Sequence, residues 1–385
     1  MPPVYFRPCS LPAAFALAAL AVFTFSAHGA ANRVRHEVAF PDLPGYTTLR
    51  CDFHMHTVFS DGQVWPTLRV EEAWRDGLDA IAITDHNEYQ RFKDDVPPKI
   101  GRSNELARPA AEGLGLLFIR GCEITRGEPP GHLNALFVQD IAAVRRDDSR
   151  EAVKSAAEQG AFIFWNHPGW KQPERKSVWY AEQEEFFRQG WLKGIEVVNG
   201  PNYDPIVHGW AVEKSLTMMA NSDVHDLISW QYDRSSGQLR PMTLVFAKEK
   251  TEAGVKEALL ARRTVVFAGG QLCGDEPLLR PFVERCIELA TPQVVLKGKA
   301  RATVQLRNRS AAVLQLKFPT AAGGLKGPAQ IELAPNAVTA VEFSRADKAP
   351  LGQRTVQLPC LVTNALTAPG VPLRIELAVP VRIAP

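Results

Sequence analysis

The feature that most restricts the fold of this chain is an alternation of short apolar runs with amphipathic segments between about residues 48 and 268. Strand-like runs such as LDAIAITDH, AFIFWNHP and LTMMANSDVH are separated by helix-like segments such as LRVEEAWRDG and REAVKSAAEQG. Several of the helix-like segments end in glycine, as helices commonly do. Strands separated by helices of this length predict βα units and a parallel sheet that can close into a barrel.

The pattern changes after about residue 288, where short runs of alternating apolar and polar residues are broken by Gly, Pro and Asn. Runs such as RATVQLRNRS, AVTAVEFSR and PLRIELAVPVRI are typical of these segments. This regular spacing predicts a small antiparallel β-sandwich, and residues 277–290 are predicted to form a linking helix. We therefore expect a barrel domain over residues 31–288 and a β-sandwich domain over residues 289–385.

The first thirty residues have the pattern of a secretory signal peptide. Arg7 precedes an unbroken apolar run from Leu11 to Phe25, and the small residues of SAHGAAN follow it. A signal peptidase would cut near Gly29 to Ala31, so we expect a periplasmic or secreted protein. The alternative is a membrane anchor, but a spanning helix needs about 20 apolar residues and this run is shorter. No later run is long enough to span a membrane, so none is expected in the mature form.

Charge and cysteine content exclude several other classes of protein. The net charge is +2 with both signs interspersed, which argues against an extended nucleic-acid groove but leaves small phosphate substrates open. Of six cysteines, Cys9 would leave with the signal peptide, and the odd number that remains leaves at least one thiol unpaired. There is no CxxC motif or dense cysteine framework. On proximity alone, Cys273 and Cys286 are the favoured disulfide.

An HxH pair introduces the candidate site. Residues 51–62 read CDFHMHTVFSDG, and a strand period of two places Asp52, His54 and His56 on one face. Two imidazoles spaced in this way can reach one metal ion, and histidine is the commonest metal ligand near neutral pH. Alone, such a pair is a weak signal, because polar residues are ordinary at the end of a strand.

The other predicted strand ends strengthen this signal. Apart from His28 and His36, every histidine except His208 lies at the start or end of an apolar run. Reactive groups gather at the carboxyl ends of the strands in parallel α/β barrels. We therefore predict one metal centre built from the polar residues at these ends, which are His54, His56, Asp61, His86, Glu123, His132, His167, Asp223 and His225.

These motifs resemble, in their order, those of the PHP (polymerase and histidinol phosphatase) superfamily. The motifs are HxH followed by SDG, then TDH, GxE with a later histidine, NHP and SDxH. The resemblance covers residues 48–270, and the combination is specific although each motif is short. Within the superfamily, segments such as VWPTLRVEEAWRDGLDAI and FWNHPGW are similar to exported phosphodiesterases of the Sb-PDE type.

The resemblance implies a distorted (β/α)7 barrel that holds up to three divalent metals. It places a first ion between His54, His56, Glu123 and Asp223. Glu123 would bridge to a second ion held by His132 and His167. A third ion would lie between Asp61, His86 and His225. All nine positions carry suitable residues, so the motif set is that of an active enzyme.

Six imidazoles and three carboxylates form a mixed nitrogen and oxygen site, which suits Zn²⁺, Mn²⁺ or Fe²⁺ better than Ca²⁺. Metals at this spacing would lower the pKa of a bridging water and supply a hydroxide that attacks phosphorus. We therefore expect metal-dependent hydrolysis of phosphate esters at a trinuclear site, with no side-chain nucleophile. Asp52 and Asp85 are candidates for orienting the ligand imidazoles.

Four further residues are candidate substrate contacts. Arg126 and Lys171 follow metal-ligand candidates closely and could hold a phosphate oxygen, although a solvated loop charge is an equally good interpretation. Asn199 and Tyr203 follow a predicted strand and could line the mouth of the site. With so few cations and with aromatic residues such as Trp170 nearby, a phosphodiester fits better than a dianionic monoester.

Three other functions stay open at this point. The first is a phosphomonoesterase of the histidinol-phosphatase type, which export disfavours because that role is biosynthetic. The second is an amidohydrolase-like metal hydrolase, although no lysine ends a ligand-bearing apolar run. The third is a non-catalytic envelope-binding protein. The sequence leaves the natural substrate, the physiological metal and the oligomeric state undetermined.

Overall fold

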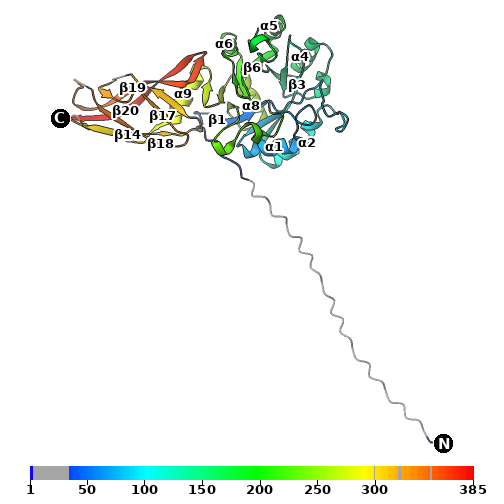
Figure 1. Cartoon of the computed structure of the whole chain (residues 1–385), viewed down its shortest axis with the longest axis horizontal. Coiled ribbons are helices and arrows are strands. Elements are labelled where there is room, and N and C mark those ends of the chain that lie inside the picture. Colours follow the sequence, from blue (N-terminus) through cyan, green and yellow to red (C-terminus); the bar gives the residue numbers. More distant parts are fainter. Residues whose placement is uncertain (3–33, 299, 320–322, 347–348) are drawn as a thin grey trace. The chain divides into compact units, whose positions relative to one another are not determined.

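The computed structural model describes residues 1–2, 34–298, 300–319, 323–346 and 349–385 (Figure 1). The chain separates into two units, Met1–Val34 and Arg35–Pro385, and all the elements described below belong to the second. Apart from residues 1 and 2, the predicted signal peptide lies outside the described residues and stays a prediction. No helix among the described residues is long and apolar enough to cross a membrane.

The amino-terminal part of the second unit is a barrel in which most strands are parallel. β1 pairs in parallel with β2 and β2 with β3, and the same holds for β5 with β6 and β6 with β8. β4 is antiparallel to both β3 and β5, and β9 is antiparallel to β1. β7 is antiparallel to β6 and β11 to β10. The predicted distorted α/β barrel is therefore confirmed, while the expectation of a parallel sheet is wrong for β4, β7, β9 and β11. The bounds are β1 Thr47–Asp52, β2 Ala80–Ile83, β3 Leu117–Ile124, β4 Leu133–Leu136, β5 Phe162–Trp165, β6 Leu192–Asn199, β7 Asn202–Tyr203, β8 Thr217–Asn221, β9 Met242–Ala247, β10 Thr264–Ala268 and β11 Gln271–Cys273.

Helices lie outside these strands (Figure 1). Glycines with positive φ follow several of them, as at Gly77 after α1 and Gly160 after α4, which confirms these two predicted helix ends. Short polar side chains cap others: Asp148 accepts from Glu151 N at the start of α4, and Asp204 accepts from Ile206 N at the start of α6. The helices are α1 Pro66–Arg75, α2 Arg102–Gly113, α3 Ile141–Val144, α4 Ser149–Glu158, α5 Ala181–Arg188, α6 Pro205–Glu213, α7 Ile228–Gln231, α8 Glu252–Leu260 and α9 Glu276–Cys286, with 3-10 turns at Pro173–Arg175 and Arg234–Ser236.

The carboxyl-terminal half is a sandwich of two largely antiparallel sheets, as predicted. One sheet contains β13, β20 and β19 with β15 and β17, and the other has the order β12-β14-β18-β16. β19 also pairs in parallel with β11 of the barrel, so one sheet continues from one half into the other. The bounds are β12 Ile287–Leu289, β13 Val294–Lys297, β14 Arg301–Asn308, β15 Leu314–Lys317, β16 Leu325–Lys326, β17 Gln330–Leu333, β18 Val338–Arg345, β19 Gly352–Ala368 and β20 Val371–Ala384.

The cysteines of the described residues are packing groups. Cys51, Cys122, Cys273, Cys286 and Cys360 are all buried and free, so the expected disulfide between Cys273 and Cys286 is wrong. Cys273 ends β11, whereas Cys286 ends α9 and lies in a different hydrophobic cluster. Burial raises the pKa of both thiols to about 12, which makes them poor nucleophiles at neutral pH.

Candidate metal centre

The candidate ligands come from the ends of strands on one side of the barrel. β1 ends at Asp52 rather than at His56, because the chain leaves the strand and pairs with the segment that follows β8. His56 N donates to Val224 O at 3.0 Å, and Asp223 N donates to His54 O at 2.9 Å. An isolated bridge likewise joins His86 to Glu123. These backbone contacts hold the four ligand-bearing segments together in two pairs.

Four donor atoms form a compact cage at the first predicted site. His54 Nε2 lies 3.1 Å from His56 Nε2, and each of these nitrogens lies 3.1 Å from Asp223 Oδ1. Glu123 Oε2 lies 3.3 Å from the first nitrogen and 3.2 Å from the second. A tetrahedral ion with bonds of about 2.0–2.1 Å would separate its donor atoms by about 3.3 Å. The cage therefore has the dimensions that a small divalent ion requires.

The second oxygen of Glu123 faces the second predicted site. Glu123 Oε1 lies 2.7 Å from His132 Nδ1 and 3.9 Å from His167 Nε2. His167 Nε2 is also 3.9 Å from Asp223 Oδ2. The carboxylate of Glu123 thus presents one oxygen to each of two groups of donors, which is the arrangement that a bridging ligand needs.

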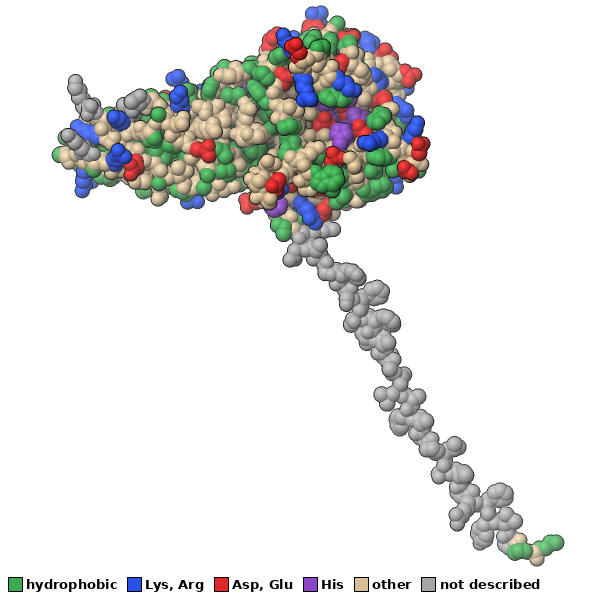
Figure 2. Space-filling model, viewed as in Figure 1, with side chains coloured by type: hydrophobic (Ala, Val, Ile, Leu, Met, Phe, Trp, Pro, Cys, Tyr) green, Lys and Arg blue, Asp and Glu red, His purple; other side chains and the backbone are tan. Residues whose placement is uncertain are grey.

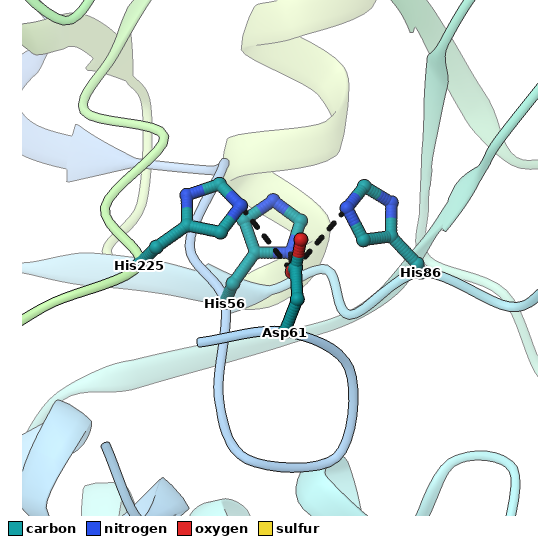
Figure 3. A group of neighbouring side chains, drawn as sticks. All are labelled: His56, Asp61, His86 and His225. Carbon is teal, nitrogen blue, oxygen red and sulfur yellow. Dashed lines mark ion pairs between the residues drawn. The ribbon is translucent and has the colours of Figure 1, made fainter. Parts of the chain in front are cut away.

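The third predicted site surrounds Asp61, whose carboxylate lies between His86 and His225 (Figure 3). Asp61 Oδ1 is 3.4 Å from His86 Nε2 and 3.3 Å from His225 Nε2. His56 Nδ1 lies 3.8 Å from the same oxygen, so His56 stands between the first and third sites. The structure therefore brings all nine candidate ligands together in four overlapping groups.

Unpaired buried atoms in this centre fit a bound metal. Five atoms of the candidate ligands are buried and make no hydrogen bond of acceptable geometry: Asp61 Oδ1, Glu123 Oε1, His132 Nδ1, His167 Nδ1 and Asp223 Oδ1. Buried polar atoms in native proteins are rarely left unpaired, and unpaired groups in a cluster point to an ion or water. The residues present therefore fit a divalent transition metal.

The charges of the centre point to the same conclusion. Burial by itself would lower the pKa of His54, but the carboxylates of Asp223, Glu196 and Glu123 outweigh it and raise the pKa well above its usual value. Burial would raise the pKa of Glu123, but the surrounding histidines outweigh it and hold the pKa well below its usual value. The carboxylates thus attract protons onto the imidazoles, and a divalent cation would replace those protons.

Glu196, in the middle of β6, is a functional residue that the sequence analysis missed. Glu196 Oε1 accepts from His54 Nδ1 at 2.8 Å, which leaves His54 Nε2 free for the first site. Asn221 and Asn199 side chains also donate to the Glu196 carboxylate, and His167 N does so at 2.9 Å. Glu196 is 1% exposed, and its place inside a run of apolar residues was the only sequence signal.

The two aspartates predicted to orient imidazoles have other partners. Asp52 pairs with the buried guanidinium of Arg240 at 3.0 Å and accepts from Ser222 Oγ at 2.6 Å. Asp85 accepts from Ser60 Oγ at 2.6 Å, and that hydroxyl lies 3.3 Å from His56 Nδ1. Asp85 therefore reaches the His56 imidazole through Ser60. Asp52 instead accepts from the backbone N–H groups of His54 and Ser222, at 3.3 Å and 3.2 Å.

The four candidate substrate contacts lie in different surroundings. Arg126 pairs with Glu88 at 2.6 Å, which leaves this cation largely compensated. The Lys171 ammonium lies over the ring of Trp170, 4.0 Å from its centroid. Asn199 donates to Glu196 at 2.9 Å and lies 3.3 Å from Asp223 Oδ2, so it touches the centre itself.

Tyr203 lies farther out. Its hydroxyl is hydrogen-bonded to His208 Nδ1 at 2.9 Å, which places His208 outside the metal centre, as expected. Tyr203 and Asn199 line a cavity of about 320 Å³ together with His167 and Trp170. Histidine side chains are visible in a hollow on this face of the molecule, with Lys and Arg side chains at its rim (Figure 2).

Comparisons with known proteins find the same two domains. The family description of the PHP domain matches residues 52–189, and that of an Ig-like domain matches residues 287–378. A solved two-domain structure from Bacteroides vulgatus, described as containing a predicted PHP-like metal-dependent phosphoesterase, is 42% identical with a TM-score of 0.84. The match covers 90% of this chain and 99% of that one. The uncharacterized protein MJ1295 of Methanocaldococcus jannaschii is 28% identical over 203 residues, which is 49% of this chain and 88% of that protein.

Proposed function

The chain belongs to the PHP-like metal-dependent phosphoesterases, and we propose that it hydrolyses phosphodiesters at a centre of up to three divalent metals. The observation that carries this proposal is the Glu123 carboxylate, with one oxygen in the cage of His54 and His56 and the other beside His132. Divalent ions held at such a centre lower the pKa of water and neutralise charge on phosphoryl oxygens. Zn²⁺, Mn²⁺ and Fe²⁺ suit the donor set.

The protein's own residues position these ligands and keep the charges balanced. The Glu196 carboxylate holds the proton of His54 on Nδ1, so that Nε2 faces the cage. Asn199 donates to Glu196 and approaches the outer oxygen of Asp223, which fixes the rotamers of both carboxylates. Among the described residues near the centre, no serine or cysteine is placed as a nucleophile, since Ser60 and Ser222 are bound to Asp85 and Asp52. Water is therefore the proposed nucleophile.

Preference for a diester is supported by the cavity beside His167. It is lined by Trp170, Tyr203 and Ile206, which suit an uncharged ester group. Its one arginine, Arg175, lies at the 3-10 turn, and Lys171 lies over Trp170 rather than among the lining residues. A monoester dianion is usually surrounded by several cations or N–H donors. This side of the centre therefore favours the single charge and the two organic groups of a diester.

Hydrolysis of bis(p-nitrophenyl) phosphate and of p-nitrophenyl phosphate, compared under matched metal conditions, tests this preference. We expect kcat/KM for the diester to exceed that for the monoester by at least roughly tenfold, which corresponds to about 1.4 kcal/mol in transition-state stabilisation. Equal rates or a preference for the monoester would favour the phosphomonoesterase alternative. Cleavage of amides but not of phosphate esters would favour the amidohydrolase alternative.

Export is part of the proposal and has its own support. Arg7, the apolar run from Leu11 to Phe25 and the small residues after it form the signal-peptide pattern. We propose that the mature enzyme acts in the periplasm or outside the cell, in the manner of the exported Sb-PDE-type phosphodiesterases that it resembles. Amino-terminal sequencing of protein from a fractionated native host would show a start near residues 29–31, whereas a full-length cytosolic chain would contradict it.

A further inference from the structure

A second cavity, of about 360 Å³, borders the metal centre at His86, whereas the cavity described above borders it at His167. It is lined by the segment that follows β2, by the start of α2 and by Ile141 and Arg145 at the two ends of α3. His86 belongs both to this cavity and to the third metal site. The cavity and the metal centre are therefore neighbours that share a side chain.

The cavity is rich in positive charge. Lys93, Lys99 and Arg145 line it, and all three are exposed. Lys99 pairs with Glu105 at 3.0 Å, but neither Lys93 nor Arg145 makes an ion pair within the part of the chain that the structure describes. Because these two cations have no ion-pair partner among the described residues, their charge is available to attract an anion.

The acidic residues of the same cavity are already engaged. Asp85 accepts hydrogen bonds from Thr57 and Ser60. Glu88 accepts from Thr125 N at 2.9 Å and pairs with Arg126 at 2.6 Å. These carboxylates therefore neutralise little of the charge of Lys93 and Arg145.

Uncharged donors face the same space. Gly101 is the N-cap of α2 with φ 75° and makes no side-chain cap, and residues 101, 103 and 104 line the cavity. Arg102 N already donates to Lys99 O at 3.0 Å, so the N–H groups of residues 103 and 104 are the ones that this helix start offers to negative charge. Independently, the Asn87 side chain is 8% exposed and lines the cavity, and its Nδ2 makes no hydrogen bond of acceptable geometry among the described atoms, with the Cys122 thiol as its polar neighbour. A buried amide donor without a partner is costly unless a ligand satisfies it.

We propose that this anion cavity, defined by Asn87, Lys93, Lys99, Gly101 and Arg145, binds a second acidic group of the substrate. The lining cations Lys93 and Arg145 have no ion-pair partner among the described residues, whereas the lining carboxylates Asp85 and Glu88 are bound to Ser60 and Arg126. The ligand that fits this charge is therefore a carboxylate or a phosphate. The inference rests on the proposed function and adds the substrate class to it. The substrate is an asymmetric phosphodiester whose anionic arm enters the anion cavity, while its uncharged arm lies against Trp170 and Tyr203.

A matched pair of esters tests the assignment: p-nitrophenyl butyl phosphate and p-nitrophenyl 3-carboxypropyl phosphate. They have the same leaving group and chain length and differ by one carboxylate. We expect kcat/KM to be at least roughly tenfold higher for the carboxypropyl ester, mainly through KM, since a charge-assisted contact at a partly enclosed site corresponds to about that factor. Substitution of Lys93→Gln and Arg145→Gln together should remove most of this ratio.

The control is Lys297→Gln with Arg382→Gln, a pair of exposed cations in β13 and β20 that loses the same charge far along the chain. It should keep the ratio between the two esters. If the protein hydrolyses both esters equally well, the proposal is overturned although the phosphodiesterase function stands. If it hydrolyses neither ester, the proposed function fails, and the anion cavity is then tested only by the binding of sulfate.

That binding measurement uses sulfate at constant ionic strength and follows the Tm of the metal-loaded protein. An anion that binds the folded state raises Tm, so the wild type and the control variant should gain more from sulfate than the Lys93/Arg145 variant does. Equal gains in all three proteins would overturn the proposal. A selective gain with no preference between the esters would show that the cavity takes a free anion rather than a substrate arm, which also overturns it.

Discussion

At the scale of single residues, Glu123 is the group on which the whole centre depends. It is fully buried at the end of β3, and its two oxygens lie against different groups of histidines. A buried carboxylate in this position is stable only while opposite charge surrounds it. The residue therefore couples the first and second sites to each other and to the strand that carries it.

Replacing Glu123 with Gln should remove this coupling while keeping the shape of the side chain. The neutral amide is a poor metal ligand, so we expect a loss of at least roughly a hundredfold in kcat/KM and of at least about one equivalent of metal. Steady-state kinetics with elemental analysis measures both. Glu184→Gln is the matched control, because Glu184 lies on α5 and accepts from Trp179 and Arg188 instead. Near-full activity and metal content in Glu123→Gln would refute the proposed ligand set.

Glu196 should act on the metal through His54. In Glu196→Gln, the charged acceptor for His54 Nδ1 becomes an amide that can present N–H instead of oxygen. Such outer partners typically account for about 10–100-fold in metal affinity. We expect an affinity loss of this order at one site, with activity largely restored by excess metal. Metal titration monitored by activity checks this, and a loss that excess metal leaves unchanged would show that Glu196 acts in another way.

At the scale of elements, the positions of the metal ligands depend more on the short loops that follow the strands than on the strands themselves. The loop between β1 and α1 carries Asp61, and it is closed by a backbone bond from Val58 N to Val64 O at 3.1 Å. Gly62 lies so close to the preceding turn that a Cβ there would stand 2.7 Å from both His56 C and Thr57 N. The loop can hold Asp61 in place only because residue 62 has no side chain.

Gly62→Ala should therefore displace Asp61 without unfolding the barrel. The added methyl group meets backbone atoms that cannot move aside cheaply, so the loop must shift. We expect the third site to lose its metal while the first and second keep theirs. Elemental analysis and circular dichroism would show this loss with secondary structure intact. Gly113→Ala is the control, because a Cβ at Gly113 meets nothing within 4 Å. An unchanged metal content in Gly62→Ala would contradict this account of the loop.

Elements also show how far the sequence alone could predict this structure. Apolar runs that end in His, Glu or Asp indicated which segments carry the candidate ligands, because the carboxyl ends of barrel strands converge. The antiparallel direction of β4 was hidden, since an apolar run of four residues has the same composition in either direction. The role of Glu196 could not be predicted, because its partner His54 is 142 residues away along the chain. Lys93 and Arg145 were overlooked because neither lies next to a ligand in sequence.

At the scale of the whole molecule, the two halves of residues 35–385 share both a sheet and a core. Leu272 and Cys273 of β11 register with Ala365 and Leu366 of β19. One hydrophobic cluster includes Phe267 and Phe282 as well as residues of the sandwich. The sandwich is therefore more than an appended module, because its longest strand extends the sheet that holds the metal-bearing strands of the barrel.

Metal content is the prediction that belongs to the whole molecule. The nine donors lie on segments from residue 54 to residue 225, so bound ions would join most of the barrel. We expect purified active protein to carry two to three equivalents of transition metal, taking four donors as about the number that one such ion needs. Chelation should abolish hydrolysis and lower Tm, because metal that binds only the folded chain stabilises it. Elemental analysis that finds one equivalent or fewer in active protein would exclude the trinuclear centre. A Tm that chelation leaves unchanged would show that the clustered carboxylates and imidazoles balance one another's charge without any ion.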